Sequence, residues 1–268
     1  MTKKALCVGI NDYPIAGMEL NGCVNDARAW SSLLRKQYDF ASADVRVLLD
    51  GAATHEHVTD GLKALLAGAR SGDVLVFTNS SHGTYVADDG SDEADRYDEA
   101  MCPYDCKKHL LTDDELRALL TDIPRGVRLT VISDSCHSGS VTRAAEGPAT
   151  PDDRRVRFLN PRNLRQPEIK DVRNRATPRR TEVHPESEMK ELLLSGCRSN
   201  QYSYDAIFGR RYQGAMSFYA LKVIKDAGYR LTYSALATRL REALAVSNYD
   251  QQPQLEGKPS FKRRQIFT

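Results

Sequence analysis

The sequence lacks the features that mark several classes of protein. No apolar run approaches the ~20 residues that a membrane-spanning helix needs. The apolar stretch Ala5–Ile10 is followed at once by Asn11 and Asp12, and it is too short for a signal peptide. Six cysteines among 268 residues are not the density of a disulfide-stapled secreted domain. These absences predict a cytoplasmic protein that has no membrane partner and whose cysteines are mostly reduced.

An excess of charge of one sign is also missing. The chain has 38 basic and 36 acidic residues, which gives a formal net charge of +2. No global field therefore favours binding to nucleic acid or to a membrane surface. The charge is uneven only locally, since residues 88–105 are acidic and residues 143–180 are rich in arginine.

Apolar runs rich in β-forming residues alternate with stretches of helical periodicity. The expected strands are Ala5–Ile10, Val45–Leu49, Val74–Phe77, Val127–Ile132, Lys190–Ser195 and a last short piece near Pro253–Leu255. The expected helices are Gly22–Gln37, Thr54–Ala69, Asp113–Leu120, Ala215–Ala227 and Tyr233–Val246. This alternation predicts an α/β fold of three layers: a mostly parallel central sheet of about six to eight strands, covered by helices on both faces.

No linker of proline, glycine and serine divides the chain, so residues 1–268 are expected to form a single domain. Its first part is residues 1–142 and its last part is residues 186–268. Between them, residues 143–185 have little apolar periodicity and form a basic connecting loop. A loop of this length inside a compact domain is uncommon and is usually functional or disordered.

Two of the expected strands are each followed, a few residues after the strand ends, by a reactive side chain. The strand at Val74–Phe77 runs into Ser80-Ser81-His82-Gly83, and the strand at Val127–Ile132 runs into Asp134-Ser135-Cys136. Ligand sites of parallel sheets lie beyond the carboxyl ends of the strands. A thiol beside an imidazole is what nucleophilic catalysis by cysteine requires. The amides of Gly83 and Cys136 are candidates for an oxyanion hole.

These motifs resemble those of the caspase clan, and specifically those of bacterial or type I-like metacaspases. A histidine about 50 residues before the cysteine is the caspase spacing. Asp134-Ser135-Cys136 stands where caspases have Gln-Ala-Cys, as in metacaspases. Three further segments resemble family motifs and extend the likeness over almost the whole chain: residues 20–27, 193–198 and 252–255. The resemblance implies a caspase-like fold, a monomer, and a cysteine endopeptidase with Cys136 as nucleophile and His82 as base.

Two other readings of these residues stay open. A free cysteine is more often a small buried hydrophobe than a nucleophile, although the partner histidine and the flanking motifs favour catalysis. His137 is a rival base, but a sequence neighbour usually points away from the thiol.

The resemblance also implies an acidic pocket for the residue whose carbonyl is attacked. Its lining would be Asp26, Ser80 and Asp134. Carboxylates in a cleft bind a guanidinium or an ammonium by charge-assisted hydrogen bonds, so cleavage is expected after arginine first and lysine second. Otherwise Asp26 is a helix cap or an exposed residue, and Asp134 a turn residue at a strand end.

By resemblance to calcium-activated metacaspases, Ca2+ is an expected cofactor with Asp98, Asp113 and Asp114 as ligands. Hard oxygen ligands in a flexible loop suit this ion, although the acidic run lacks EF-hand spacing. The alternative is a solvated acidic loop, with Asp113 at a helix N-terminus. Zinc on Cys102, Cys106 and His109 is less favoured, because one ligand of a closed site is missing.

The arginines of the basic connecting loop are the residue type that the enzyme is expected to cut. The candidates for self-cleavage are Arg143, Arg155, Arg157 and Arg180. Alternatively, the loop occupies the cleft as a brake, or it is simply a surface loop. Binding of nucleic acid is disfavoured because no aromatic residues interleave with the arginines. Two rival functions remain: an inactive caspase-like module that binds partners, and a peptidase of the same clan that prefers asparagine or aspartate.

Overall fold

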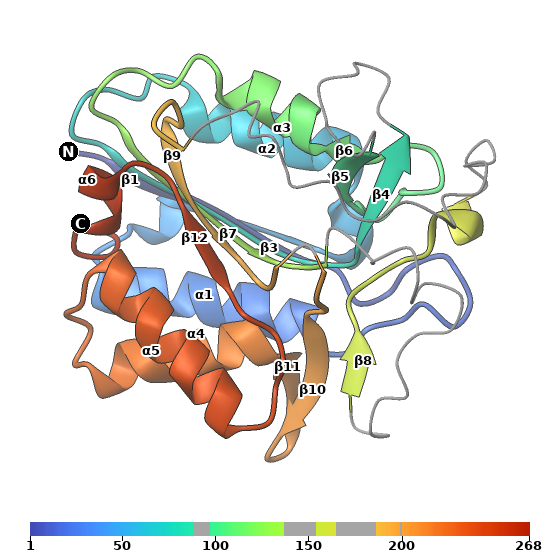
Figure 1. The fold of residues 1–268 in the computed structure, drawn as a ribbon. Helices are drawn as coiled ribbons and strands as arrows, with labels where there is room; N and C mark the ends of the chain where they lie inside the picture. Colours follow the sequence, from blue (N-terminus) through green and yellow to red (C-terminus); the bar gives the residue numbers. More distant parts are fainter. Residues whose placement is uncertain (88–96, 137–153, 165–185, 199) are drawn as a thin grey trace.

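The computed structural model describes residues 1–87, 97–136, 154–164, 186–198 and 200–268 (Figure 1). Its central sheet has six strands in the order β12-β9-β7-β3-β1-β2. They are β1 (Lys3–Gly9), β2 (Val45–Leu49), β3 (Val74–Ser80), β7 (Arg128–Asp134), β9 (Glu191–Ser195) and β12 (Gln254–Glu256). All neighbouring pairs are parallel except the edge pair β12–β9. The predicted mostly parallel sheet is confirmed.

Helices cover both faces of this sheet (Figure 1). One face carries α1 (Cys23–Gln37), α4 (Ala215–Asp226) and α5 (Tyr233–Val246), and the other carries α2 (His55–Leu66) and α3 (Asp113–Leu120). Successive side chains of a strand point to opposite faces, so the strands contribute side chains to two separate hydrophobic cores, one on each face of the sheet. Val74 and Val76 pack with Trp30 of α1, whereas Leu75 and Phe77 pack with Leu62 of α2.

Two smaller antiparallel sheets follow the ends of the central strands. One joins β4 (Gly83–Ala87), β5 (Tyr97–Met101) and β6 (Leu111–Thr112), and the other has the order β11-β10-β8. The second contains β8 (Arg154–Val156), β10 (Tyr204–Phe208) and β11 (Arg211–Gly214). The short helical elements are η1 (Ser42–Asp44), η2 (Asp50–Ala52), η3 (Pro161–Leu164) and α6 (Pro259–Lys262).

The strand β8 is a departure from the sequence-based expectation, because it lies within the segment 143–185 that was expected to be a loop. Arg154-Arg155-Val156 has no apolar alternation of its own. Its strand geometry comes from pairing with β10, and tertiary context of this kind commonly overrides local propensity. Within the described ranges, no helix is long and apolar enough to cross a bilayer.

Candidate active site

His82 and Cys136 lie just beyond the carboxyl ends of two neighbouring strands. β3 and β7 pair in parallel with Ser80 opposite Asp134, and each reactive residue follows its strand by two positions. The backbones approach closely here: a Cβ atom added at Gly83 would lie 1.9 Å from the carbonyl oxygen of Cys136. Only glycine fits at position 83, because any side chain would push the two strand ends apart.

The imidazole of His82 is held in one tautomer. Its Nε2 lies 2.8 Å from the carbonyl oxygen of Met18, which accepts, so Nε2 carries the proton. Its Nδ1 is buried and has no hydrogen-bond partner among the described residues. Burial lowers the pKa of His82 to about 4, against the opposing effect of the Met18 carbonyl. The ring is therefore neutral at pH 7, with a lone pair on Nδ1 that is able to accept a proton.

The thiol of Cys136 is fixed by the backbone of Ser203. Its Sγ accepts from the Ser203 amide at 2.7 Å and donates to the Ser203 carbonyl at 3.3 Å. The side chain is fully buried. Ser203 directly precedes β10, so the nucleophile candidate is anchored by the same strand that pairs with β8.

A segment of the chain itself lies against both groups. The carbonyl oxygen of Arg157 accepts from the Gly83 amide at 3.0 Å and from the Cys136 amide at 3.2 Å. The Arg157 amide donates to the Ser203 carbonyl at 2.9 Å. The two amides that the sequence suggested for an oxyanion hole thus converge on one carbonyl oxygen, as they would on the carbonyl of a bound substrate.

The side chain of Arg157 is fully buried among three carboxylates. Its guanidinium is 2.7 Å from Asp26 Oδ2, 3.1 Å from Asp205 Oδ1 and 3.2 Å from Asp134 Oδ2. It also donates to the Asp134 carbonyl at 3.0 Å. A buried arginine is tolerated only with such partners, because an unpaired charge in the interior costs several kcal/mol.

Backbone amides and hydroxyls hold each of the three acids in place. Both Asp26 oxygens accept from the Gly214 amide, at 3.0 and 3.1 Å. Asp134 accepts from the Ser203 hydroxyl and from the Ser217 amide. Asp205 accepts from the amides of residues 21 and 22. Contacts other than those with Arg157 therefore help to hold each of the three acids in position.

The residues on either side of Arg157 are also held. Phe158 lies between Tyr85 and Tyr202, with ring centroids 5.9 and 6.2 Å away. The Leu159 amide donates to the Gly83 carbonyl at 2.9 Å. Arg155, by contrast, reaches outward to the Glu19 carbonyl at 2.7 Å. Among the four expected self-cleavage arginines, only Arg155 and Arg157 are described; Arg143 and Arg180, like the rival base His137, lie outside the described residues.

Two residues, Ser80 and Asp205, need separate comparison with the pocket that the family resemblance implies. Ser80 makes no hydrogen bond with Arg157, and its Oγ is buried without a partner in the described part of the chain. Asp205 was missed. The signal for it was an acid inside the strand Tyr204–Phe208, whose other members are apolar or aromatic. A buried strand carries such a charge only when it has a partner.

The pKa of Asp26 gives this pocket a pH dependence. Burial raises that pKa to about 7, although Arg157 lowers it. Because the Arg157 guanidinium lowers this pKa, a guanidinium in the pocket and a proton on Asp26 oppose each other. We expect kcat/KM for arginyl peptides to fall as the pH is lowered and Asp26 gains a proton, mainly through KM. Asp26→Asn should lower kcat/KM and abolish that step; an unchanged midpoint in this variant would contradict the assignment.

The three acids expected to bind calcium are only partly gathered. Asp113 and Asp114 both pair with Arg117, the former at 3.0 Å. Asp98 lies on β5 two residues before Ala100, which pairs with Thr112 immediately ahead of Asp113. Burial raises the pKa of Asp113, and within the part of the chain that the structure describes its Oδ1 has no hydrogen-bond partner. Among the described residues no three histidine, cysteine or acidic side chains lie together as a metal-binding group, and this holds for the calcium set and for Cys102, Cys106 and His109 alike.

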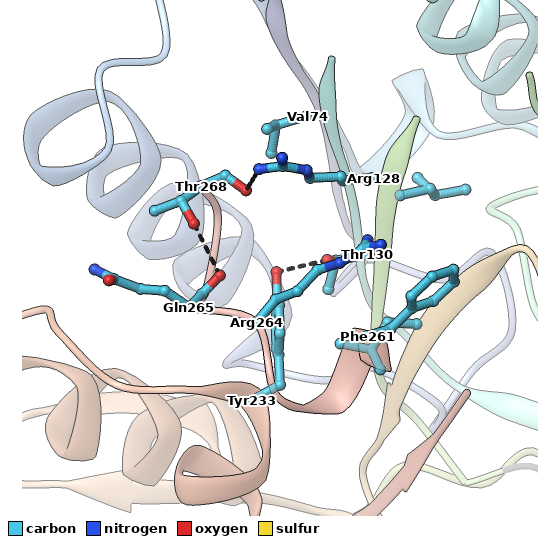
Figure 2. A pocket seen from close by; sticks show the side chains of 10 residues that line it. Val74, Arg128, Thr130, Tyr233, Phe261, Arg264, Gln265 and Thr268 are labelled. Carbon is cyan, nitrogen blue, oxygen red and sulfur yellow. Dashed lines mark hydrogen bonds between the residues drawn. The ribbon is translucent and has the colours of Figure 1, made fainter. Parts of the chain in front are cut away.

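A small pocket lies at the opposite end of the central sheet (Figure 2). It is lined by Val74 and Arg128, the first residues of β3 and β7, together with Tyr233, Arg264 and Thr268. The Arg128 guanidinium donates to the Thr268 carbonyl at 2.8 Å there. This pocket is remote from His82 and Cys136, which follow the last residues of the same two strands.

Known structures with this architecture include a caspase. The chain superimposes on Caspase-1 from Spodoptera frugiperda with a TM-score of 0.61 and 14% identity, over 95% of this chain and 86% of that one. The crystal structure of protein GSU0716 from Geobacter sulfurreducens is more similar, with a TM-score of 0.74 and 27% identity over 100% and 99% of the two chains. The fold is thus that of the caspase-like proteins.

Sequence comparison narrows this class to one family. Residues 3–144 match the family described as metacaspase, peptidase C14 domain. Metacaspase-1 of Mycosarcoma maydis is 31% identical over 94% of this chain and 69% of its own length. Metacaspase-4 of Arabidopsis thaliana is 42% identical over 54% of this chain, which spans 36% of that relative. The chain belongs to the metacaspase family of cysteine peptidases.

Proposed function

We propose that the chain is a cysteine endopeptidase that cleaves after arginine, and after lysine more slowly. One observation carries this: Arg157 sits with its carbonyl oxygen between two amides and its guanidinium among three acids. That is the placement of a residue about to be cut. Arginine suits the pocket because its planar fork donates to several carboxylates at once, whereas a lysine ammonium is a single point charge.

The proposed reaction begins at the thiol of Cys136. Its proton passes to Nδ1 of His82 while Sγ bonds to the carbonyl carbon of the substrate arginine. The resulting oxyanion is stabilised by the amides of Gly83 and Cys136. When the tetrahedral intermediate collapses, the C–N bond breaks and His82 returns the proton to the leaving amine.

A thioester between Cys136 and the substrate remains. Water attacks it, His82 takes a proton from that water, and the C–S bond breaks to release a carboxylic acid and the thiolate, which regains its proton from His82. The Met18 carbonyl serves throughout by keeping the proton of the neutral ring on Nε2 and the lone pair on Nδ1.

A panel of fluorogenic peptides that differ only in the residue before the cleaved bond tests the proposed specificity. We expect arginine to be fastest and lysine roughly tenfold slower. Aspartate should be cut at least about 10³-fold more slowly, because a fourth carboxylate in the pocket is repelled. Faster release after aspartate or asparagine would favour the rival clan peptidase. Release after none of the four would favour an inactive module.

We further propose that the chain cuts itself between Arg157 and Phe158, and that the uncut segment acts as a brake until then. The support is that Arg157 fills the acidic pocket, so no substrate can enter while it stays there. Arg155 points instead to the Glu19 carbonyl, and it fits a role as a neighbouring contact rather than the cut residue.

Calcium is proposed as an activating ion held by Asp98, Asp113 and Asp114. The buried Asp113 Oδ1 has no hydrogen-bond partner among the described residues and is able to accept a cation. Arg117 now neutralises two of the three acids and would have to turn away. The ion would supply positive charge to order the β5–α3 corner, with no part in bond cleavage.

Calcium binding can be measured without an activity assay. We expect millimolar Ca2+ to raise the Tm of the chain, whereas Mg2+ at the same concentration should have little effect, because it demands a smaller, more regular site. Asp113→Asn should abolish the shift, and Asp122→Asn, whose residue lies beyond α3, should retain it. No shift in the unaltered chain would remove calcium from this proposal.

A further inference from the structure

We infer that Tyr249 and the carbonyl of Asn248 form a second arginine-binding subsite, for the residue three positions before the cleaved arginine. Preferred substrates would then carry the pattern Arg-x-x-Arg. This rests on the proposed function, since it takes the docked segment at 154–157 as an image of a substrate. It goes beyond that function by assigning a recognition site outside the acidic pocket.

The contacts of Arg154 carry the inference. The guanidinium carbon of Arg154 lies 4.1 Å from the centroid of the Tyr249 ring, a cation–π contact. Its Nη1 donates to the Asn248 carbonyl oxygen at 3.0 Å. The guanidinium is thus recognised by its flat face and by its donor edge at once, a combination that lysine cannot reproduce.

The strand pairing fixes which substrate position meets this subsite. Val156 pairs with Tyr204 and Arg154 with Ala206, in antiparallel register on β10. A substrate that adds to β10 in the same register would place its side chains alternately on the two faces. The side chain of Arg155 accordingly points to Glu19, away from the Tyr249 subsite. The preference should therefore hold whatever residue directly follows the first arginine, at the position of Arg155.

Contacts other than those with Arg154 hold the residues of the subsite in place. Tyr249 packs against Tyr204 and Tyr219, with ring centroids 6.0 and 5.9 Å away. Its amide donates to the Leu244 carbonyl at the end of α5. Asn248 takes a left-handed conformation with φ 59°. The C-terminus of a helix is the negative end of its dipole, so this corner favours a cation.

The test uses peptides that differ only at the inferred position. Arg-Ala-Val-Arg and Ala-Ala-Val-Arg fluorogenic peptides are compared on the full chain carrying Arg154→Ala and Arg157→Ala. These substitutions remove both guanidinium groups and their contacts, so that a peptide can displace residues 154–157 from β10. We expect kcat/KM to be about tenfold higher for the first peptide. A peptide with neutral citrulline at that position should resemble the alanine peptide. Tyr249→Leu should bring the ratio close to one, and Tyr249→Phe should keep it.

The outcomes separate this inference from the proposed function. A ratio near one in the cleared chain, or a ratio unchanged by Tyr249→Leu, overturns the subsite while cleavage after arginine stands. If neither peptide is cut, fluorescence anisotropy of the same peptides on the Cys136→Ala form of the cleared chain decides. Tighter binding of Arg-Ala-Val-Arg that Tyr249→Leu abolishes supports the subsite, and equal binding overturns it. A Tm measurement on each variant identifies misfolding. If Tyr249→Leu does not fold, the citrulline peptide is compared with Arg-Ala-Val-Arg on the Tyr249→Phe form and on the cleared chain.

Discussion

Replacing Cys136 with alanine should reduce peptide hydrolysis by a factor on the order of 10⁵ to 10⁶, the loss seen when a catalytic nucleophile is removed. His82→Ala should lose a comparable amount, because the thiol then has no base. The two losses should not add, since the residues act as a unit in one proton transfer. The measurement is kcat on an arginyl peptide, with calcium present.

Cys7→Ala is the matched control. Cys7 is a fully buried cysteine on β1, and its truncation removes one small core side chain without touching the strand ends. It should lower the Tm modestly and leave kcat within about twofold. If Cys136→Ala kept more than a hundredth of the activity, another residue would have to be the nucleophile.

Arg157→Ala should release the brake. A tethered segment competes at an effective concentration on the order of millimolar. A peptide at tens of micromolar is then outcompeted by roughly ten- to a hundredfold. The initial rate of the Arg157→Ala chain on a peptide should exceed that of the uncut wild-type chain by about that factor. The variant should also lose cleavage at position 157.

Arg155→Ala serves as the comparison, because Arg155 contacts the exposed Glu19 carbonyl and not the acidic pocket. Its initial rate should stay within a few-fold of wild type. Should Arg157→Ala instead be no faster than the uncut wild-type chain, the segment would not be a brake. Arg157→Ala also leaves Asp26, Asp134 and Asp205 without their counter-ion. Free arginine methyl ester should therefore raise the Tm of the Arg157→Ala chain.

The central strands were predictable because both of their faces are buried. β3 is buried at every position, and a continuous apolar run is the signature of such a strand. The sequence alone therefore predicted where β3 and β7 end, and with that the position of His82 and Cys136 just beyond the two strands. Their assignment as catalytic residues stays a prediction that the variants above test.

The smaller sheets could not be predicted in the same way. β5 carries Asp98 and Glu99 within five residues, and β8 is Arg154-Arg155-Val156. Neither has the apolar alternation of a half-buried strand. Both are strands only because a neighbouring strand supplies the hydrogen bonds, and that depends on contacts between distant parts of the chain.

The acidic pocket shows the same limit. Asp26 and Asp134 were expected from motifs near the first strand and the nucleophile, and both contact Arg157. Asp205 lies 48 positions from Arg157 along the chain and joins them only after β10 pairs with β8. Ser80 lies opposite Asp134 on β3, yet it makes no hydrogen bond to the guanidinium. The motifs predicted that the pocket is acidic. Which residues contact the guanidinium depends on how distant segments of the chain pack, and the motifs did not predict that.

Intact-mass analysis of the purified full chain, incubated with calcium beside its Cys136→Ala form, tests most directly whether Arg157 lies in the cleft as a substrate. We predict two fragments, residues 1–157 and 158–268, with Phe158 as the new N-terminus, and no change in the Cys136→Ala chain. A chain that stays whole, or that is cut only elsewhere, would contradict the proposal that Cys136 attacks the carbonyl of Arg157.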